Sequence, residues 1–142
     1  MTKREAADNQ AINLAAVERY AAAWQAGDRA AIADCYHNDF TLHYFGQNPF
    51  AGDHSGKQVA LATLSKFAAR TNRKLLSIID VMAGPQRAII IARESFEREG
   101  RRAEFDRILV YAIKDERLHE CWVYDGDRAV VDLFLAEVIS LG

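Results

Sequence analysis

The second half of the chain is a succession of four β-strand patterns, and this succession constrains the fold more than any other feature. The patterns cover residues 75–83, 87–98, 101–113 and 118–124. Ala88–Ala92 is continuously apolar, which is typical of a strand buried on both faces. Turn signals at Gly84–Pro85 and Glu99–Gly100, and the short link over 114–117, favour pairing between consecutive strands. The sequence therefore predicts an antiparallel meander.

The first third of the chain has helical periodicity instead. Apolar and aromatic residues repeat at four-residue spacing and form one helical face: Ile12, Ala16, Tyr20 and Trp24. Gly27 is placed to end this helix, and Asp28 can cap a short second helix. We expect a strand to follow over residues 40–45.

A glycine-rich stretch separates that strand from a third helix. Residues 46–56 contain three glycines and Pro49, which disfavours regular structure, so we expect a loop. Ser55 and Gln58 match a capping box and predict the start of the third helix. After the meander, Asp125 or Asp127 can cap a short last helix.

Helices followed by an antiparallel meander predict an α+β fold. We expect one domain over residues 1–142, because a chain of this length can bury about two-thirds of its unfolded surface around one core. The expected architecture is a curved antiparallel sheet wrapped around about three N-terminal helices, with a short C-terminal helix. The concave interior of such a sheet is a natural site for a ligand.

Composition excludes several classes of protein. The formal net charge of -2 argues against a nucleic-acid footprint, and no apolar run approaches the roughly 20 residues of a membrane helix. Cys35 and Cys121 lie in apolar patterns without a CxxC motif, so we expect reduced core residues of a cytoplasmic protein. The histidines lack metal-ligand spacing and no phosphate-binding glycine motif occurs, so neither a metal nor a cofactor is expected.

One carboxylate stands out among the strand patterns. Asp106 lies in the middle of a predicted strand, between Phe105 and the apolar segment 108–110. Burying an anion there is costly, so we expect Asp106 to be hydrogen-bonded, protonated or facing a cavity. The alternative is a structural ion pair with a nearby arginine: Arg93, Arg101 or Arg107.

Several short segments carry a resemblance to known proteins. Glu18–Tyr20, Ala26–Asp28 and Asp39–Thr41 resemble the opening of ketosteroid isomerases. Leu42–Gln58 is similar to the SnoaL-like pattern of a histidine, a Pro/Gly loop and a glycine before a helix, and Leu118–Trp122 resembles the same branch. The chain thus resembles the nuclear-transport-factor-2-like superfamily, which implies a cone-shaped fold.

The resemblance also implies site residues. Tyr20 falls where ketosteroid isomerases place an oxyanion-hole tyrosine, and Asp106 where they place a protonated aspartic acid. In SnoaL-like cyclases an aspartate in this region acts as a base. The isomerase base aligns near His43 and Tyr44, where this chain has no carboxylate. These two residues are neighbours on an alternating strand, so only one can face the interior. The SnoaL-like pattern favours His43, and strict register against the isomerases favours Tyr44.

We therefore expect Asp106, Tyr20 and His43 to be the catalytic residues, with His43 able to carry a proton near neutral pH. The residues expected to contact a substrate are aromatic: Tyr44, Trp24, Phe40, Phe67 and Trp122.

Two functions are consistent with these residues. The first is a SnoaL-like protein that binds a small apolar carbonyl compound and acts as a cofactor-independent isomerase, cyclase or dehydratase by acid/base chemistry. The second is a non-catalytic ligand-binding or dimerisation module of the same fold, which the missing base supports. We also expect a homodimer through the outer face of the sheet, onto which Arg107, Leu109 and Tyr111 would project if Asp106 faced inward. A nucleic-acid or membrane partner is not expected.

Overall fold

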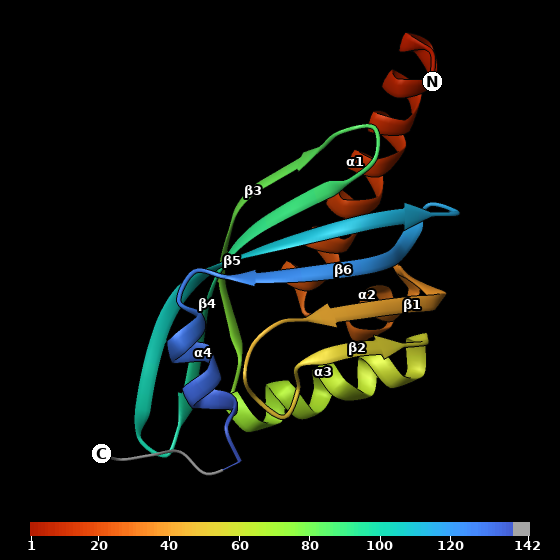
Figure 1. Ribbon diagram of the computed structural model, residues 1–142. Coiled ribbons are helices and arrows are strands. Elements are labelled where there is room, and N and C mark those ends of the chain that lie inside the picture. The colour runs from red at the N-terminus through yellow and green to blue at the C-terminus, as the bar shows by residue number, and fades with distance from the viewer. Residues whose placement is uncertain (138–142) are drawn as a thin grey trace.

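A computed structural model of the protein describes residues 1–137 (Figure 1). The helices are α1 (Lys3–Ala26), α2 (Arg29–Asp34), α3 (Lys57–Thr71) and α4 (Arg128–Leu135). The strands are β1 (Tyr36–Tyr44), β2 (Gly52–Ser55), β3 (Lys74–Ala83), β4 (Ala88–Arg98), β5 (Arg101–Lys114) and β6 (Arg117–Asp125).

The strands form one curved sheet in the order β2-β1-β6-β5-β4-β3 (Figure 1). The predicted meander is confirmed, because β3 to β6 pair consecutively and antiparallel. The sheet is nevertheless mixed, since β1 pairs with β6 in parallel. A tight turn forces antiparallel pairing only between strands that it connects directly, and the whole meander separates β1 from β6 along the chain.

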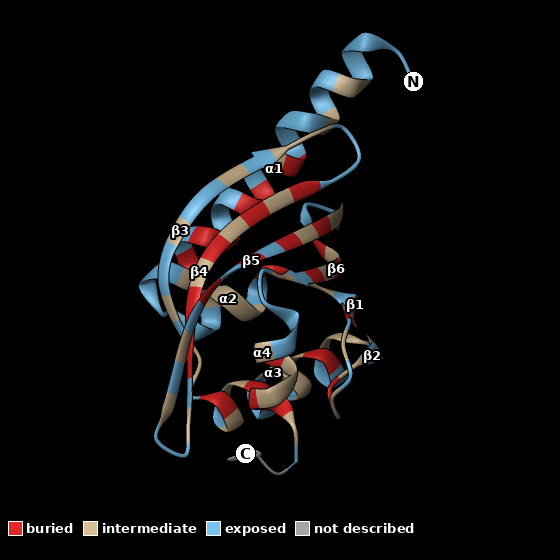
Figure 2. Cartoon of the chain, turned by 60° about the vertical axis from the view of Figure 1, so that its left-hand side comes forward, coloured by how far each residue is buried: buried red, intermediate tan, exposed pale blue. Residues whose placement is uncertain are grey.

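The sheet curls around α1 and α3, and α4 lies near its lower end (Figures 1 and 2). Helix α1 packs on β3, β4 and β5, and α3 packs on β1 and α4. We call the concave side of the sheet the interior face, the convex side the outer face, and the space that the sheet and helices enclose the cone.

Local signals explain most of the helix ends. Gly27 has the left-handed conformation (φ 66°) and ends α1, as predicted. The side chains of Asp28 and Asp127 accept backbone hydrogen bonds at the N-termini of α2 and α4, so Asp127 rather than Asp125 caps the last helix. The predicted capping box is wrong. Ser55 ends β2, and α3 begins after Gly56 without a side-chain cap.

The interior face holds the core, as the buried segments in Figure 2 show. Phe40, Phe67 and Phe96 are almost fully buried, and the rings of Phe67 and Phe96 meet edge to face with centroids 5.2 Å apart. Phe134 and Leu135 on α4 are buried in the same cluster. Each such side chain contributes about 1.5–3 kcal/mol relative to an exposed one.

Strand β5 alternates cleanly between the two faces. Phe105, Arg107, Leu109 and Tyr111 are buried, whereas Asp106 and Ile108 are exposed. The predicted orientation of this strand is therefore wrong by one residue: Arg107, Leu109 and Tyr111 point into the cone. This alternation decides which side chains form the site.

The two cysteines and the apolar character of the helices can also be compared with the sequence predictions. Cys35 and Cys121 are both buried and free, in agreement with the prediction that they are reduced. No helix among residues 1–137 combines the length and the apolar character that a membrane crossing requires.

Candidate ligand-binding site

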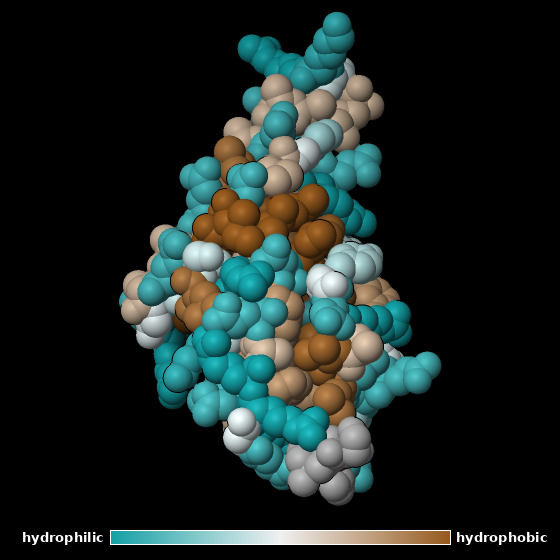
Figure 3. Space-filling view, turned by 90° about the vertical axis from the view of Figure 1, so that its left-hand side faces the viewer, coloured by the Kyte–Doolittle hydropathy of each residue, from teal (hydrophilic) through white to brown (hydrophobic). Residues whose placement is uncertain are grey.

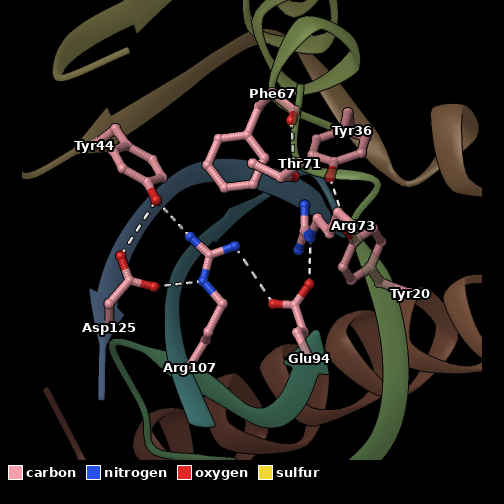
Figure 4. A network of polar contacts seen from close by, with 9 residues as sticks. All are labelled: Tyr20, Tyr36, Tyr44, Phe67, Thr71, Arg73, Glu94, Arg107 and Asp125. Carbon is pink, nitrogen blue, oxygen red and sulfur yellow. Dashed lines mark hydrogen bonds and ion pairs between the residues drawn. The ribbon is translucent and has the colours of Figure 1, made fainter. Parts of the chain in front are cut away.

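A network of charged side chains lies inside the cone (Figure 4). Its centre is Arg107 on β5, whose side chain is 2% exposed. Arg107 donates from Nε to Asp125 Oδ1 at 2.5 Å and from Nη2 to Tyr44 Oη at 2.7 Å. Its Nη1 lies 3.4 Å from Oε2 of Glu94, which is fully buried. Burial alone lowers the pKa of Arg107, but Tyr44, Glu94 and Asp125 raise it overall, so this cation is fixed.

A second arginine extends the network toward the surface. Arg73 lies between α3 and β3, directly after Asn72, which ends α3 in the left-handed conformation. Its Nε donates to Oε1 of Glu94, so one carboxylate bridges two arginines. The guanidinium carbon of Arg73 lies 5.1 Å from the ring centroid of Trp24. A buried charge is tolerated only when it is paired and hydrogen-bonded, and here two arginines face two carboxylates.

A pair of tyrosines lies beside Arg73. Tyr36 Oη donates to Tyr20 Oη at 2.8 Å, and both side chains are buried. Burial raises the pKa of Tyr20 and raises that of Tyr36 well above its ordinary value. The two hydroxyls therefore keep their protons at neutral pH, and they act as hydrogen-bond donors rather than as bases.

Two hollows meet at these residues. The interior cavity, lined by Tyr44, Phe67 and Arg107 among others, has a volume of about 20 Å³, which is room for a single water molecule. A larger groove of about 650 Å³ opens between α1, α2 and α3. The cavity and the groove share four lining residues: Tyr20, Tyr36, Leu64 and Arg73. The groove is in the size range of small-molecule sites, and its floor is polar.

Several predicted site residues lie at these hollows. Tyr20, Phe40, Tyr44 and Phe67 line the interior cavity, and Trp24 lines the groove. Tyr44 rather than His43 faces the interior, because the buried residues of β1 alternate through Phe40 and Tyr44. That these residues bind a ligand stays a prediction.

The predicted position of Asp106 is wrong. It lies on the outer face with its side chain 51% exposed, and it accepts a hydrogen bond from Arg93 Nη1 at 2.9 Å. The pairing of β4 with β5 places Arg93 directly opposite Asp106, so the carboxylate has a charged partner in solvent. Asp106 and Tyr20 therefore do not share a cavity.

His43 and Trp122 also lie on the outer face, contrary to prediction. Their rings stack at 5.0 Å with an interplanar angle of 12°. His43 Nδ1 lies 2.7 Å from Oδ1 of Asp53, and Trp122 carries Arg87 above its ring. These contacts follow from the register, which sets His43 between Asp53 and Trp122 on neighbouring strands. Neither side chain can reach a ligand in the cone.

Sequence reasoning missed the charged residues that do face inward. Glu94 follows Ala88, Ile90 and Ala92 at two-residue spacing, so it shares the face of small and apolar residues. That spacing was the available signal for its burial. Among residues 1–137 no group of three or more His, Cys, Asp or Glu side chains is placed to hold a metal ion.

The curved sheet and the helices that it encloses form a cone-shaped α+β domain, and its mainly apolar interior contains a buried network of charged side chains. The family model described as "SnoaL-like domain" matches residues 17–121, and the chain therefore belongs to the SnoaL-like family. This confirms the resemblance seen in the sequence. No curated protein matches the chain.

Solved structures agree with this assignment. Bal32a, from a soil-derived mobile gene cassette, is 25% identical, with a TM-score of 0.80 over 89% of this chain and 98% of its own. An NTF2-like protein from Burkholderia xenovorans LB400 is 19% identical, with a TM-score of 0.70 over 86% and 94%. A putative SnoaL-like polyketide cyclase from Jannaschia sp. CCS1 is 13% identical, with a TM-score of 0.71 over 91% and 94%. The latter two share the fold.

Proposed function

We propose that the protein binds a small organic ligand with an apolar body and a carbonyl-type oxygen in the groove between α1, α2 and α3. One observation carries this proposal: the groove of about 650 Å³ has apolar walls and a floor of hydrogen-bond donors. Arg73 and the Tyr20–Tyr36 pair supply those donors. Few, convergent polar groups in an apolar hollow are the usual composition of a small-molecule site.

Binding without chemistry is the better supported reading. A proton abstraction needs a base, and neither a carboxylate nor a histidine lines the groove. The carboxylates of the interior, Glu94 and Asp125, are held by arginines. A tyrosine is protonated at neutral pH even in water, and burial raises the pKa values of this pair further, so neither hydroxyl is a base.

A cofactor-independent isomerase, cyclase or dehydratase is the second candidate. The donors at the groove floor favour it, because an arginine and a tyrosine aimed at one oxygen can stabilise an enolate. One fold neighbour is described as a putative polyketide cyclase. In such a reaction the base would have to be solvent or a group of the substrate itself.

The two tryptophans allow a direct test of binding. Trp24 lines the groove and Trp122 lies on the outer face, so their indole N–H signals in a ¹H–¹⁵N spectrum report on two distant places. Titration with 2-acetonaphthone, a neutral aromatic ketone, should shift the Trp24 signal and leave Trp122 in place. The proposal is overturned if neither this ketone nor the related aromatic compounds 2-naphthoate and 2-naphthamide shift the Trp24 signal at millimolar concentration.

A matched pair of variants checks the location. Ala69 lines the groove, so Ala69→Phe should fill it and abolish the Trp24 shift. Ala62 is exposed on the same helix and does not line the groove, so Ala62→Phe should bind as the unchanged protein does. Equal binding by both variants would place the ligand elsewhere.

We also propose that the protein forms a homodimer through the outer face of the sheet. Apolar side chains gather on the side of β3 and β4 in Figure 3. Ile91, Ile108 and Tyr124 form one row across three strands, and Ile108 and Tyr124 are 41% and 48% exposed. Contiguous exposed apolar side chains on a sheet mark an interaction surface.

Light scattering tests this assembly. We expect twice the chain mass of 15.9 kDa for the unchanged protein. Ile108→Glu should give the monomer, whereas Val59→Glu on the exposed side of α3 should not change the mass. A monomer in the unchanged protein at micromolar concentration would contradict the proposal.

A further inference from the structure

Given the proposed binding function, on which this rests, we infer that the ligand is an anion, and specifically that its body carries a carboxylate bound by the terminal nitrogens of Arg73. Four features of the groove lead to this assignment: the free edge of one guanidinium, the sign of the lining charges, an unused hydroxyl hydrogen and the apolar walls.

The guanidinium of Arg73 has a free edge. Glu94 takes the Nε hydrogen, and no residue among those described, 1–137, accepts a hydrogen bond from Nη1 or Nη2. The side chain is 17% exposed and lines both the cavity and the groove. A guanidinium presents donors in a rigid planar fork that matches the two oxygens of a carboxylate. Since Glu94 fixes the other side of the group, the edge is held in place before a ligand arrives.

The charges that line the groove have one sign. Arg73 and Arg29 are its charged lining residues, and both are cations. Glu94 does not line the groove, and it is shared with Arg107 deeper in the cone. An anion entering the groove therefore meets attraction from both arginines without a facing carboxylate. A neutral ligand can accept hydrogen bonds from these donors, but it gains less than an anion from the two positive charges.

The tyrosine pair offers one more donor. Tyr20 and Tyr36 carry two hydroxyl hydrogens, and the bond between the two oxygens uses one of them. No other described residue accepts a hydrogen bond from either hydroxyl. The second hydrogen is available to an oxygen in the hollow beside Arg73. Donors to an ionised oxygen form shorter and stronger bonds than donors to a neutral one.

The walls define the rest of the ligand. Apolar side chains from three helices line the groove: Trp24, Ile32, Leu61, Leu64 and Ala68. These walls favour a ring system over a long polar chain, because burial of apolar area drives binding. The predicted ligand class is therefore an aromatic or alicyclic monocarboxylate.

A matched pair of probes separates charge from shape. 2-Naphthoate and 2-naphthamide have the same ring and a planar substituent of similar size, but only the first is an anion at pH 7. Isothermal titration at low salt should give a Kd for naphthoate at least about tenfold lower than for naphthamide. The Trp24 indole signal should shift with naphthoate while the Trp122 signal does not. Added salt should weaken the naphthoate complex more than the amide complex.

Variants of two arginines locate the effect. Arg73→Gln should remove the preference for naphthoate, and Arg73→Lys should retain part of it, because a lysine keeps the charge but lacks the planar fork. Arg93→Gln is the control, since it removes one positive charge from the outer face. If Arg73→Gln does not fold, the comparison of the two probes on the unchanged protein still decides.

The outcomes distinguish this inference from the function on which it rests. If neither probe nor the neutral ketone shifts Trp24, the proposed binding function is wrong. If naphthamide binds as tightly as naphthoate, the groove binds ligands but the assigned charge is wrong. A folded Arg73→Gln variant that keeps the full preference for naphthoate would also overturn the assignment.

Discussion

Two ion pairs of the same chemical type lie on opposite faces of neighbouring strands. Arg107 and Glu94 meet inside the cone at 3.4 Å, with side chains 2% and 0% exposed. Arg93 and Asp106 meet on the outer face at 2.9 Å, with side chains 42% and 51% exposed. The outer pair is closer, yet solvent screens it, and such pairs contribute at most about 1 kcal/mol. Burial rather than distance therefore determines which pair contributes more to the free energy of unfolding.

The inner pair also holds a residue of the groove in place, whereas the outer pair does not. Glu94 bridges Arg107 to Arg73, so the interior holds the guanidinium that faces the groove. The outer pair joins two strands that their backbone hydrogen bonds already join. We therefore expect changes to the interior to alter both stability and binding, and changes to the outer pair to alter neither appreciably.

The largest difference between the faces should appear at alkaline pH. Burial raises the pKa of the cavity tyrosines Tyr20, Tyr36, Tyr44 and Tyr111, and raises that of the Cys121 thiol to about 12. The folded protein thus keeps protons that the unfolded chain releases near the ordinary values, about 8.5 for Cys and about 10 for Tyr. The free energy of unfolding should be unaffected by these groups below those values and fall as pH rises through them.

Urea unfolding at a series of pH values measures this loss. A Tyr124→Phe background removes the tyrosine of the outer face, so that the tyrosinate absorbance comes from the cavity. That absorbance should rise together with the loss of secondary structure. Ionisation of the cavity tyrosines in a fully native protein would show that they are not buried.

The next largest effect is expected from Arg107→Met. This variant removes a buried cation and leaves Glu94 and Asp125 facing an apolar side chain, at a cost of roughly 3–5 kcal/mol in unfolding free energy. Arg93→Met on the outer face should cost less than about 1 kcal/mol. Urea unfolding midpoints of the two variants measure both losses. Equal losses of unfolding free energy in Arg107→Met and Arg93→Met would contradict the prediction.

Tyr44→Phe should give an intermediate effect. It removes the hydroxyl that accepts from Arg107 and lies 3.2 Å from Asp125, and it leaves both charges short of a partner. We expect a loss of about 1–3 kcal/mol. Tyr124→Phe, the equivalent change on the outer face, should stay within about 0.5 kcal/mol of the unchanged protein. Thermal unfolding of both variants is sufficient to see the difference.

Asp106→Asn should have the smallest effect. The substitution removes an exposed partner of Arg93, so the unfolding free energy should change by less than about 1 kcal/mol. Binding of 2-naphthoate should be unchanged, because Asp106 is not a lining residue of the groove. A loss of binding without a loss of stability would restore Asp106 to the site.

Most of the secondary structure was readable from the sequence because its signals are local. Periodicity, Gly27, Asp28 and Asp127 define helix ends within a few residues of their own positions. Strand β2 was missed because Gly52 begins a four-residue segment whose pairing with β1 depends on distant residues. The parallel contact of β1 with β6 was missed for the same reason.

The orientation of β5 shows where local reading fails. Over residues 105–111 each face carries one charged residue among apolar ones, Asp106 on one and Arg107 on the other. Within this segment both orientations satisfy strand alternation, and only the ends of the strand, where Arg102, Glu104 and Lys114 share the face of Asp106, favour the observed one. Glu94 and Asp125 on the neighbouring strands stabilise the observed orientation, because their carboxylates pair with Arg107 in the interior. The site residues on the helices were easier to place, because Tyr20 and Trp24 share one helical face with the core.

The bridged arginines have a consequence for the rate at which the protein unfolds. Tyr44 and Arg107 are 63 residues apart in the chain, and their hydrogen bond joins β1 to the meander. A contact of such long range forms only after β1 and the meander have come together, so it is expected to be absent from the folding transition state. Tyr44→Phe should then accelerate unfolding more than it slows refolding in stopped-flow experiments. An interaction that forms after the transition state lowers the unfolding rate, so this contact lengthens the lifetime of the folded protein.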